Sequence, residues 1–363
     1  MIKMKEHNYF VDFLRFVFSI GILFYHSWRF TGVFGNGIAN SGFLGVDFYF
    51  MVTGYLMINS IRNHKKSKDP VLKESFDFIW KKFKNLFPSL LVVFLIGLVF
   101  VYSESVIADP EIILKKNLIS KVLPELFQLG ILGYELPINS SWWYISAMFF
   151  AFGILCPLAI KYKEYYCKYI APLIIFITLG ITATFEINIY DPMVKSLFMR
   201  NGFYTAIVFI SLGNISYVLA EMIRNKKLGK KQIILLSILE IVIYSILILS
   251  LHYSFLGGFL FATLLMIVMP ITFSNVTYST KIFKHKIWTE LGKYGFYVFL
   301  CNISIRTYLL KKYQYVCIRY RYLFIKFVII SCLVALAAYI LVEIVYKKWL
   351  LQKINNKKVL KKV

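Results

Sequence analysis

Ten long apolar runs are the feature of this sequence that most restricts its fold. The hydrocarbon layer of a bilayer is about 30 Å thick, and a helix needs about 20 apolar residues to cross it. Of the 363 residues, 59% are hydrophobic, which is more than one soluble domain of this length can bury. We therefore predict an all-α polytopic membrane bundle of about ten transmembrane helices. The predicted spans are Phe10–Ser27, Gly42–Ser60, Leu86–Ser103, Trp142–Ile160, Ile170–Phe185, Phe203–Ala220, Ile233–Ser250, Phe255–Phe273, Tyr294–Leu310 and Leu323–Tyr346.

The net charge of the chain is strongly positive, at +24. A nucleic-acid-binding protein would gather such charge on one basic face, whereas here Lys and Arg stand in short clusters between apolar runs. Clusters of this kind are retained on the cytoplasmic side of a membrane, where they meet anionic lipid headgroups. We therefore exclude nucleic acid as a partner and expect contacts with membrane lipids.

The largest basic clusters also predict the orientation of the chain. Eight Lys or Arg lie in Arg62–Lys84, five in Arg224–Lys231 and seven in the tail from Lys347. With ten spans these clusters and both termini are cytoplasmic, while the segments Trp28–Ser41 and Val106–Asn117 lie outside. One cluster disagrees, because with ten spans it would lie outside: Arg306, Lys311, Lys312, Arg319 and Arg321.

The whole chain, 1–363, is predicted to be one membrane domain with a basic cytoplasmic tail from about 347. We find no internal repeat and no appended soluble domain. The stretch Leu118–Gly133 is apolar but short, is interrupted by Pro124, and carries Lys121 and Glu125. We expect it to be an interfacial or re-entrant segment, not a span.

Two ionisable residues of the first apolar run are functional candidates, because charged groups inside a span are costly and rare. Arg15 and His26 are eleven residues apart, which on a helix leaves about 20° of angular offset and about 16 Å of rise. This separation is similar to the length of the pantetheine arm of a coenzyme A thioester. Arg15 can then hold a phosphate, while His26 accepts a proton near the acyl carbon. The structural alternative is a snorkelling Arg and an interfacial His.

The motifs around these residues resemble the integral-membrane acyltransferase family 3, whose members modify O-antigens, capsules, peptidoglycan and related glycans. Its hallmark is an Arg followed after ten residues by a His in the first helix, here Arg15 and His26. A second hallmark, a Gly-Val-Asp-aromatic-Phe run that ends in Ser-Gly-Phe-Leu, is similar to Gly45–Leu56 (GVDFYFMVTGYL). The stretch Lys81–Pro88, which we expect to be a basic loop, and the run Ser141–Ser146 (SWWYIS) agree further.

The resemblance implies a bacterial inner-membrane enzyme that moves an acyl group, acetyl from cytoplasmic acetyl-CoA, to a hydroxyl of an envelope glycan such as O-antigen or capsule. The implied partners are acyl-CoA and a glycan or lipid-linked oligosaccharide, and no metal is needed. The chain departs from the family at Asn85, where an Arg is usual, near Met148, where many members have an acidic residue, and at Asn302, where a His is often found.

Asp47, in the second motif, is expected at a depth similar to that of His26. A carboxylate bonded to the imidazole would fix its tautomer and stabilise the imidazolium, so we expect Asp47 to be the second catalytic residue. The alternative is that Asp47 only holds helices together. Asp12, three residues before Arg15, is expected to orient that Arg.

Two further groups are candidates for binding. Lys82 and Lys84 are expected to capture the phosphates of coenzyme A, although both also fit a general inside-positive bias. The aromatic run Trp142, Trp143 and Tyr144 is expected to bind the sugar, with an interfacial aromatic belt as the alternative.

Two acidic residues of the apolar runs are not assigned to catalysis. Glu240 lies within a predicted span and needs a partner there, and Glu343 is expected to pair with Lys347. A transporter of glycans or small acids is the alternative function, because buried charges in many-helix proteins are often transport sites. Against it, the sequence shows neither repeat symmetry nor paired Gly/Pro-broken helices.

Overall fold

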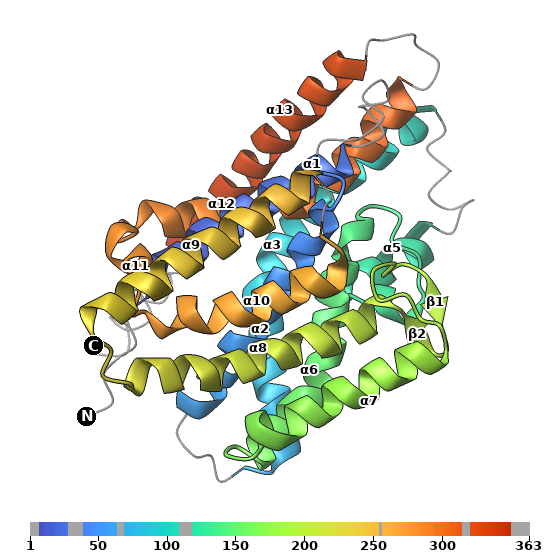
Figure 1. The fold of residues 1–363 in the computed structure, drawn as a ribbon. Helices are drawn as coiled ribbons and strands as arrows, with labels where there is room; N and C mark the ends of the chain where they lie inside the picture. The colour runs from blue at the N-terminus through green and yellow to red at the C-terminus, as the bar shows by residue number, and fades with distance from the viewer. Residues whose placement is uncertain are drawn as a thin grey trace, which may run out of the picture.

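The computed structural model describes residues 7–27, 39–63, 69–108, 118–253, 256–313 and 320–349. Each of the ten predicted spans coincides with a helix of the bundle (Figure 1). These helices are α1 (Tyr9–His26), α2 (Gly45–Asn63), α3 (Val71–Ala108), α6 (Trp143–Lys161), α7 (Ala171–Thr184), α8 (Gly202–Asn225), α9 (Lys230–Tyr253), α10 (Gly258–Ser274), α12 (Ile287–Lys312) and α13 (Tyr320–Tyr339).

Eight helical segments of the described chain are long and apolar enough to cross a membrane. They contain α1, α2, α3, α6, α7, α8, α9 and α13. Of the other two, α10 has only 17 residues, and α12 carries charged residues at both ends. The all-α membrane bundle is confirmed, and ten is an approximate count of its spans.

Shorter elements connect and extend these helices. The 3-10 turns η2 (Gly42–Leu44) and η4 (Ser140–Trp142) lead into α2 and α6, and the π-helices η5 (Tyr166–Ile170) and η6 (Ile340–Tyr346) adjoin α7 and α13. The other short elements are α5 (Leu118–Leu126), η3 (Gly130–Leu132), α11 (Ser279–Ile282) and a two-stranded hairpin of β1 (Lys195–Ser196) with β2 (Met199–Arg200). With nine residues α5 is too short to span, as expected.

The basic segment before Pro88 is helical, which the sequence analysis did not anticipate. Helix α3 begins at Val71 and runs for 38 residues with Pro88 inside it. A proline removes one backbone hydrogen bond and bends a helix, but the turns on either side can continue. Lys82 and Lys84 therefore stand on a helix and not in a loop, so their directions are fixed by the helical period.

Small residues allow the central helices to approach closely. Helix α2 packs along α8, and α1 packs along α12. A Cβ atom added at Gly54 would lie 2.0 Å from the carbonyl oxygen of Ile210, and one added at Gly213 would lie 2.1 Å from that of Met51. Only glycine permits this backbone contact, which is typical of helix pairs in membranes.

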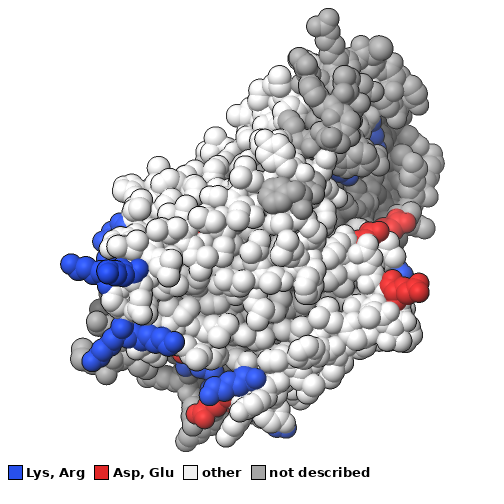
Figure 2. Space-filling view, in the orientation of Figure 1, with Lys and Arg blue, Asp and Glu red and all other residues white. Residues whose placement is uncertain are grey.

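Charged side chains gather at the ends of the bundle. Figure 2 shows most of the visible Lys and Arg at the left and lower edges of this face, Asp and Glu mainly at the right edge with some beside the lower cations, and a wide uncharged surface between them. Exposed lysines at the junction of α8 and α9 are Lys226, Lys227, Lys230 and Lys231. Parts of the predicted loops and tail, residues 28–38, 109–117, 314–319 and 350–363, lie outside the described residues.

Candidate active site

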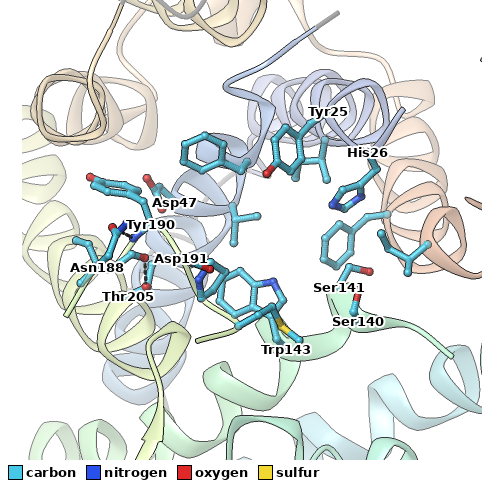
Figure 3. A pocket seen from close by; sticks show the side chains of 18 of the residues that line it. Tyr25, His26, Asp47, Ser140, Ser141, Trp143, Asn188, Tyr190, Asp191 and Thr205 are labelled. Carbon is cyan, nitrogen blue, oxygen red and sulfur yellow. Dashed lines mark hydrogen bonds between the residues drawn. The ribbon is translucent and has the colours of Figure 1, made fainter. Parts of the chain in front are cut away.

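A cavity of about 480 Å³ lies at the carboxyl end of α1, and we call it the His26 cavity (Figure 3). Its wall combines α1, α2, α6, α8 and α12 with the segment between α7 and the hairpin. The lining residues with polar side chains or rings suited to a ligand are Tyr25, His26, Asp47, Ser140, Ser141, Trp143, Asn188, Tyr190, Asp191, Thr205 and Arg306.

His26 and Asp47 both line this cavity, as predicted, but from opposite sides (Figure 3). Nδ1 of His26 lies 2.7 Å from Oδ1 of Asn302 on α12. Among the described residues, no hydrogen bond joins His26 to Asp47, and Oδ2 of Asp47 is buried without a partner. The expectation that Asp47 orients the imidazole is therefore wrong for this structure, since that contact belongs to Asn302.

Asp47 instead lies beside Tyr190, a residue of the segment before the hairpin (Figure 3). Burial, and then the charge of Asp47, raise the pKa of Tyr190, so its hydroxyl stays protonated and can donate a hydrogen bond. A carboxylate without a partner on the same wall can accept hydrogen bonds from a ligand. These groups suit a molecule rich in hydroxyls.

The cavity wall opposite α1 is anchored by a buried carboxylate. Glu125 on α5 accepts hydrogen bonds from the backbone N–H groups of Ile138, at 2.9 Å, and Asn139, at 2.6 Å. These residues immediately precede η4, which carries Ser140 and Ser141. Burial raises the pKa of Glu125 to about 7 despite these two bonds.

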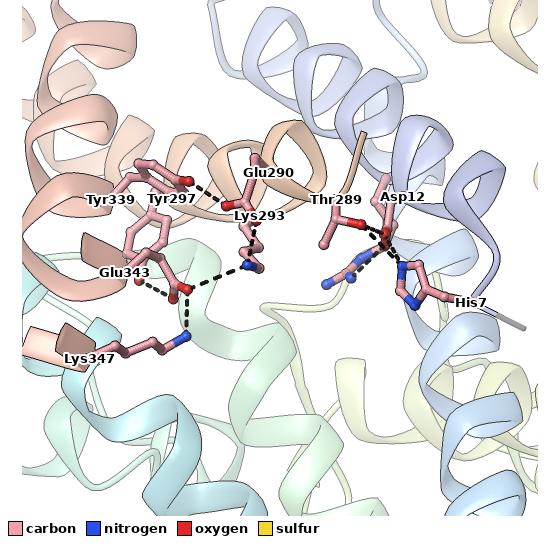
Figure 4. Close-up of polar contacts among 10 residues, drawn as sticks. His7, Asp12, Thr289, Glu290, Lys293, Tyr297, Tyr339, Glu343 and Lys347 are labelled. Carbon is pink, nitrogen blue, oxygen red and sulfur yellow. Dashed lines mark hydrogen bonds and ion pairs between the residues drawn. The ribbon is translucent and has the colours of Figure 1, made fainter. Parts of the chain in front are cut away.

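Arg15 lies in a second cavity of about 240 Å³, which we call the Arg15 cavity. Nη1 of Arg15 is 3.5 Å from Oδ1 of Asp12, so the predicted contact between them is present. Asp12 is itself held by His7, at 2.6 Å, and by the hydroxyl of Thr289, at 2.8 Å (Figure 4). Nε of Arg15 is buried and has no partner among the residues that the structure describes, so this donor is left for an anion.

Lys82 lines the Arg15 cavity, but Lys84 does not. Lys84 is exposed on the other face of α3, with its Nζ 5.2 Å from the centre of the Trp80 ring. Lys82 also lines a third cavity of about 440 Å³ toward the amino end of α3, together with Lys81 and Asn85. We call it the Lys81 cavity. Its wall also contains the carboxylates of Asp69, Glu74 and Asp77.

The three cavities follow one another through the bundle. Val46 and Phe299 line both the His26 cavity and the Arg15 cavity. Lys82 and Asn85 line both the Arg15 cavity and the Lys81 cavity. Arg15 and His26 therefore face two adjoining spaces, which matches the shared helix face predicted from their spacing.

The three aromatic residues predicted to bind sugar are separated by the structure. Trp143 lines the His26 cavity, and Tyr144 lines the Arg15 cavity, where its hydroxyl lies 3.1 Å from that of Thr53. Trp142 is fully buried, and its Nε1 donates to the carbonyl oxygen of Leu300 at 3.4 Å. Trp142 therefore offers no ring face to a sugar in this structure.

The two acidic residues left unassigned have clear partners. Oε2 of Glu240 accepts a hydrogen bond from the hydroxyl of Ser279 at 2.7 Å. Glu343 forms the predicted ion pair with Lys347, at 2.5 Å, and accepts a hydrogen bond from Tyr297 at 3.1 Å (Figure 4). Both are explained by local packing. Among the described residues, no group of three His, Cys, Asp or Glu is arranged to hold a metal ion.

Several residues of the His26 cavity were missed by the sequence analysis. Asn188, Tyr190 and Asp191 lie in a connecting segment with no recognisable motif, and only the fold brings them to the cavity. Arg306 was noticed as a cation on the unexpected side of the membrane. Its side chain lines a polar cavity, so its position has a local explanation apart from the orientation rule.

Comparison with known proteins agrees with the motifs. A family model described as an acyltransferase domain matches residues 8–343. Peptidoglycan O-acetyltransferase OatA of Listeria monocytogenes serovar 1/2a is 27% identical over 328 aligned positions, which cover 79% of this chain and 48% of that protein. The chain thus spans about half the length of this relative. No solved structure matches the present chain. Since the family match extends over nearly every helix described above, the chain belongs to this family of membrane acyltransferases.

Proposed function

We propose that this chain is an O-acetyltransferase of the bacterial inner membrane, which moves acetyl from cytoplasmic acetyl-CoA to a hydroxyl of an envelope glycan. The observation that carries this proposal is the junction of the two cavities at Val46 and Phe299. One cavity offers cations for an anionic donor, and the next offers a histidine and hydrogen-bonding groups for a hydroxylated acceptor. A thioester reaching across the junction meets both.

The donor enters by way of the Lys81 cavity. Lys81, Lys82 and Arg15 line the route in succession, and each can bind phosphate through charge-assisted hydrogen bonds. The pantetheine arm then lies along the apolar and tyrosine-rich wall of the Arg15 cavity. Binding energy from the nucleotide end positions the acyl group beside the junction.

The acceptor binds in the His26 cavity. Trp143 provides a flat apolar ring for one face of a sugar, while Asp47 and Tyr190 accept and donate hydrogen bonds to its hydroxyls. The family match and the peptidoglycan O-acetyltransferase among the relatives support an envelope glycan as the acceptor. O-antigen and capsule sugars have the same hydroxyl chemistry.

Transfer proceeds in two steps at the junction. The glycan hydroxyl oxygen attacks the thioester carbonyl carbon as its proton passes to the imidazole of His26. The carbon–sulfur bond then breaks, and the imidazole returns the proton to the leaving thiolate. The products are an acetyl ester on the glycan and free coenzyme A, whose thiol carries the proton that came from the glycan hydroxyl.

Both termini and the basic clusters are assigned to the cytoplasm in this proposal. The exposed lysines between α8 and α9 lie in one of the clusters that predict this orientation. The Lys81 cavity, lined by residues of the largest basic cluster, then opens toward the cytoplasmic supply of acetyl-CoA. The His26 cavity faces the opposite half of the membrane.

The test is transfer by the purified protein in liposomes, with acetyl-CoA labelled in its acetyl group. Soluble fragments of peptidoglycan, O-antigen and capsule are supplied as acceptors, and products are analysed by mass spectrometry. We expect labelled O-acetyl esters on one glycan class and one released thiol for each ester. Movement of glycan or acid across the bilayer without ester formation would contradict the proposal and favour a transporter.

A further inference from the structure

The contact between His26 and Asn302 determines which nitrogen of the imidazole ring carries a proton, as well as the position of the ring. Nδ1 of His26 and Oδ1 of Asn302 are 2.7 Å apart, a distance typical of a hydrogen bond. Asn302 is fully buried, one turn before Arg306 on α12. Whether Nδ1 of His26 donates or accepts this hydrogen bond depends on whether the amide of Asn302 presents its oxygen or its nitrogen.

The orientation of the Asn302 amide is fixed by the hydrogen bonds of its nitrogen atom, Nδ2. Nδ2 of Asn302 donates to the carbonyl oxygens of Val298, at 3.1 Å, and Phe299, at 2.8 Å. A rotated amide would turn Oδ1 toward these two carbonyl oxygens, where neither atom can donate. Oδ1 therefore faces His26, and it can only accept a hydrogen bond.

The imidazole must then carry a proton on Nδ1. In the neutral ring only one nitrogen is protonated, so Nε2 holds the free lone pair. A general base needs this lone pair within reach of the hydroxyl that it deprotonates. His26 lines the cavity assigned to the acceptor, while its Asn302 contact lies in the packed interior.

We propose that Asn302 is a positioning residue, which holds His26 as the Nδ1–H tautomer so that Nε2 is the base in acetyl transfer. This inference rests on the proposed function. The hydroxyl proton enters at Nε2 and leaves from the same atom to the departing thiolate, while Nδ1 keeps its proton throughout. Asn302 accordingly performs the orienting task that the sequence analysis gave to Asp47.

A neutral orienting group has a distinct electrostatic consequence. A carboxylate at this position would stabilise the imidazolium by a full charge, whereas an amide supplies orientation with only a dipole. The other charged or titratable groups on the wall are Tyr25 on α1, Asp47 on α2, Tyr190 and Asp191 before the hairpin, and Arg306 on α12. Within the described part of the chain, the hydrogen bond found at the imidazole ring is the one to Asn302, so we assign its tautomer to this contact.

The first test measures the tautomer directly in the intact protein. Histidine labelled with ¹⁵N is incorporated, and solid-state NMR spectra are recorded in liposomes. The signal of His26 is identified among the five histidines by its loss in His26→Gln. We expect a protonated Nδ1 and an unprotonated Nε2 at neutral pH. A neutral ring with its proton on Nε2 would overturn the proposal whatever the activity of any variant.

The second test compares variants by their pH profiles. Asn302→Leu removes the acceptor atom, and we expect kcat to fall by about 10²-fold or more, with KM for acetyl-CoA unchanged. Asn302→Asp keeps the shape but adds charge, so the acid limb of the kcat/KM profile should move to higher pH by about one unit or more. A packing role alone would not move this limb.

Asn214 provides the matched control. It is fully buried on α8 and lines none of the three cavities. Asn214→Asp makes the same chemical change, and the pH limb should stay in place. If Asn302→Leu retains full kcat while His26→Ala is inactive, Asn302 has no positioning role but the proposed function stands. If His26→Ala is fully active, both are wrong.

Discussion

The His26 cavity and the Arg15 cavity adjoin, yet their walls are built in different ways. All residues of the Arg15 cavity stand on the helices α1, α2, α3, α6 and α12. The His26 cavity adds the connecting segment 188–193 and the turns before α2 and α6. Helices hold side chains rigidly, whereas connecting segments vary and carry specificity. Under the proposed function, this difference predicts a constant site for the donor and an adaptable one for the acceptor.

The largest expected effect comes from His26, because the proposed mechanism gives it a part in the chemistry and not in the binding of either substrate. His26→Ala should lower kcat by about 10²- to 10⁴-fold, the usual contribution of a general base. Binding of acetyl-CoA, measured by isothermal titration calorimetry, should be unchanged since its phosphates contact the other cavity. Full acetyl transfer with normal protein levels would remove the functional distinction between the two cavities.

Trp142 and Trp143 are neighbours in the sequence but differ in their surroundings. Trp142 is buried in the core, whereas Trp143 lines the His26 cavity. Trp142→Ala should destabilise the protein by about 3 to 5 kcal/mol, as expected for a large fully buried ring. Trp143→Ala should lower the thermal midpoint less, because its ring is only partly buried, and it should raise KM for the glycan. Thermal unfolding in detergent and steady-state kinetics measure the two effects. Equal loss of stability in both variants would show that Trp143 is also a core residue.

A substitution at Arg15 tests whether the Arg15 cavity binds the acyl donor. Arg15→Ala removes a charge-assisted contact of about 1.5 to 3 kcal/mol, which corresponds to roughly a 10- to 150-fold rise in KM for acetyl-CoA. KM for the glycan should not change, because the proposed acceptor cavity lies beyond Val46 and Phe299. Lys84→Ala is the matched control, since its side chain is exposed outside both cavities. A rise in glycan KM in Arg15→Ala would contradict the division of roles.

The smallest expected effect on catalysis comes from Glu125, which makes the stability of the His26 cavity wall depend on pH. The pKa of Glu125 in the folded chain is about 7, above the value of about 4.3 for an exposed Glu. The folded state thus binds this proton more tightly, so the stability it contributes is complete below pH 4 and is lost as pH rises through 7. At about 1.4 kcal/mol per pKa unit, the difference between the two pKa values corresponds to about 3 to 4 kcal/mol of stability at most.

Glu125→Gln isolates this contribution. The variant loses one of the two backbone contacts at every pH, but it cannot titrate. The difference in unfolding free energy between the original protein and the variant should therefore decrease from pH 5 to pH 8. Thermal unfolding at several pH values checks this. A difference that does not vary with pH would show that Glu125 is ionised throughout.

The sequence predicted correctly those features that depend on a single helix. Arg15 and His26 lie on one helix, so the period of 3.6 residues was enough to place them on one face. Apolar runs located the helices for the same reason, because lipid imposes a single length scale. The Lys81–Pro88 segment misled because its charge suggested a loop, although its residues form helix readily and one proline bends α3 without ending it.

Sequence reasoning failed where distant segments meet. His26 and Asn302 are 276 residues apart along the chain, and no local pattern pairs them. Asp47 carried a family motif, which favoured it over an uncharged asparagine as the partner of His26. Trp142 and Trp143 are adjacent, so composition could not tell which ring is buried; the turn η4 decides this by pointing them to different sides.

The central claim is that a single donor lies across the junction of the two cavities, and a structure with the donor bound tests it most directly. Electron cryomicroscopy of the protein in nanodiscs with a non-reactive thioether analogue of acetyl-CoA would locate the cofactor. The account predicts phosphates beside Arg15 and Lys82, and the acyl group between Val46 and Phe299 within reach of His26. Density with the acyl end turned away from His26, or a nucleotide bound outside the Arg15 and Lys81 cavities, would contradict it.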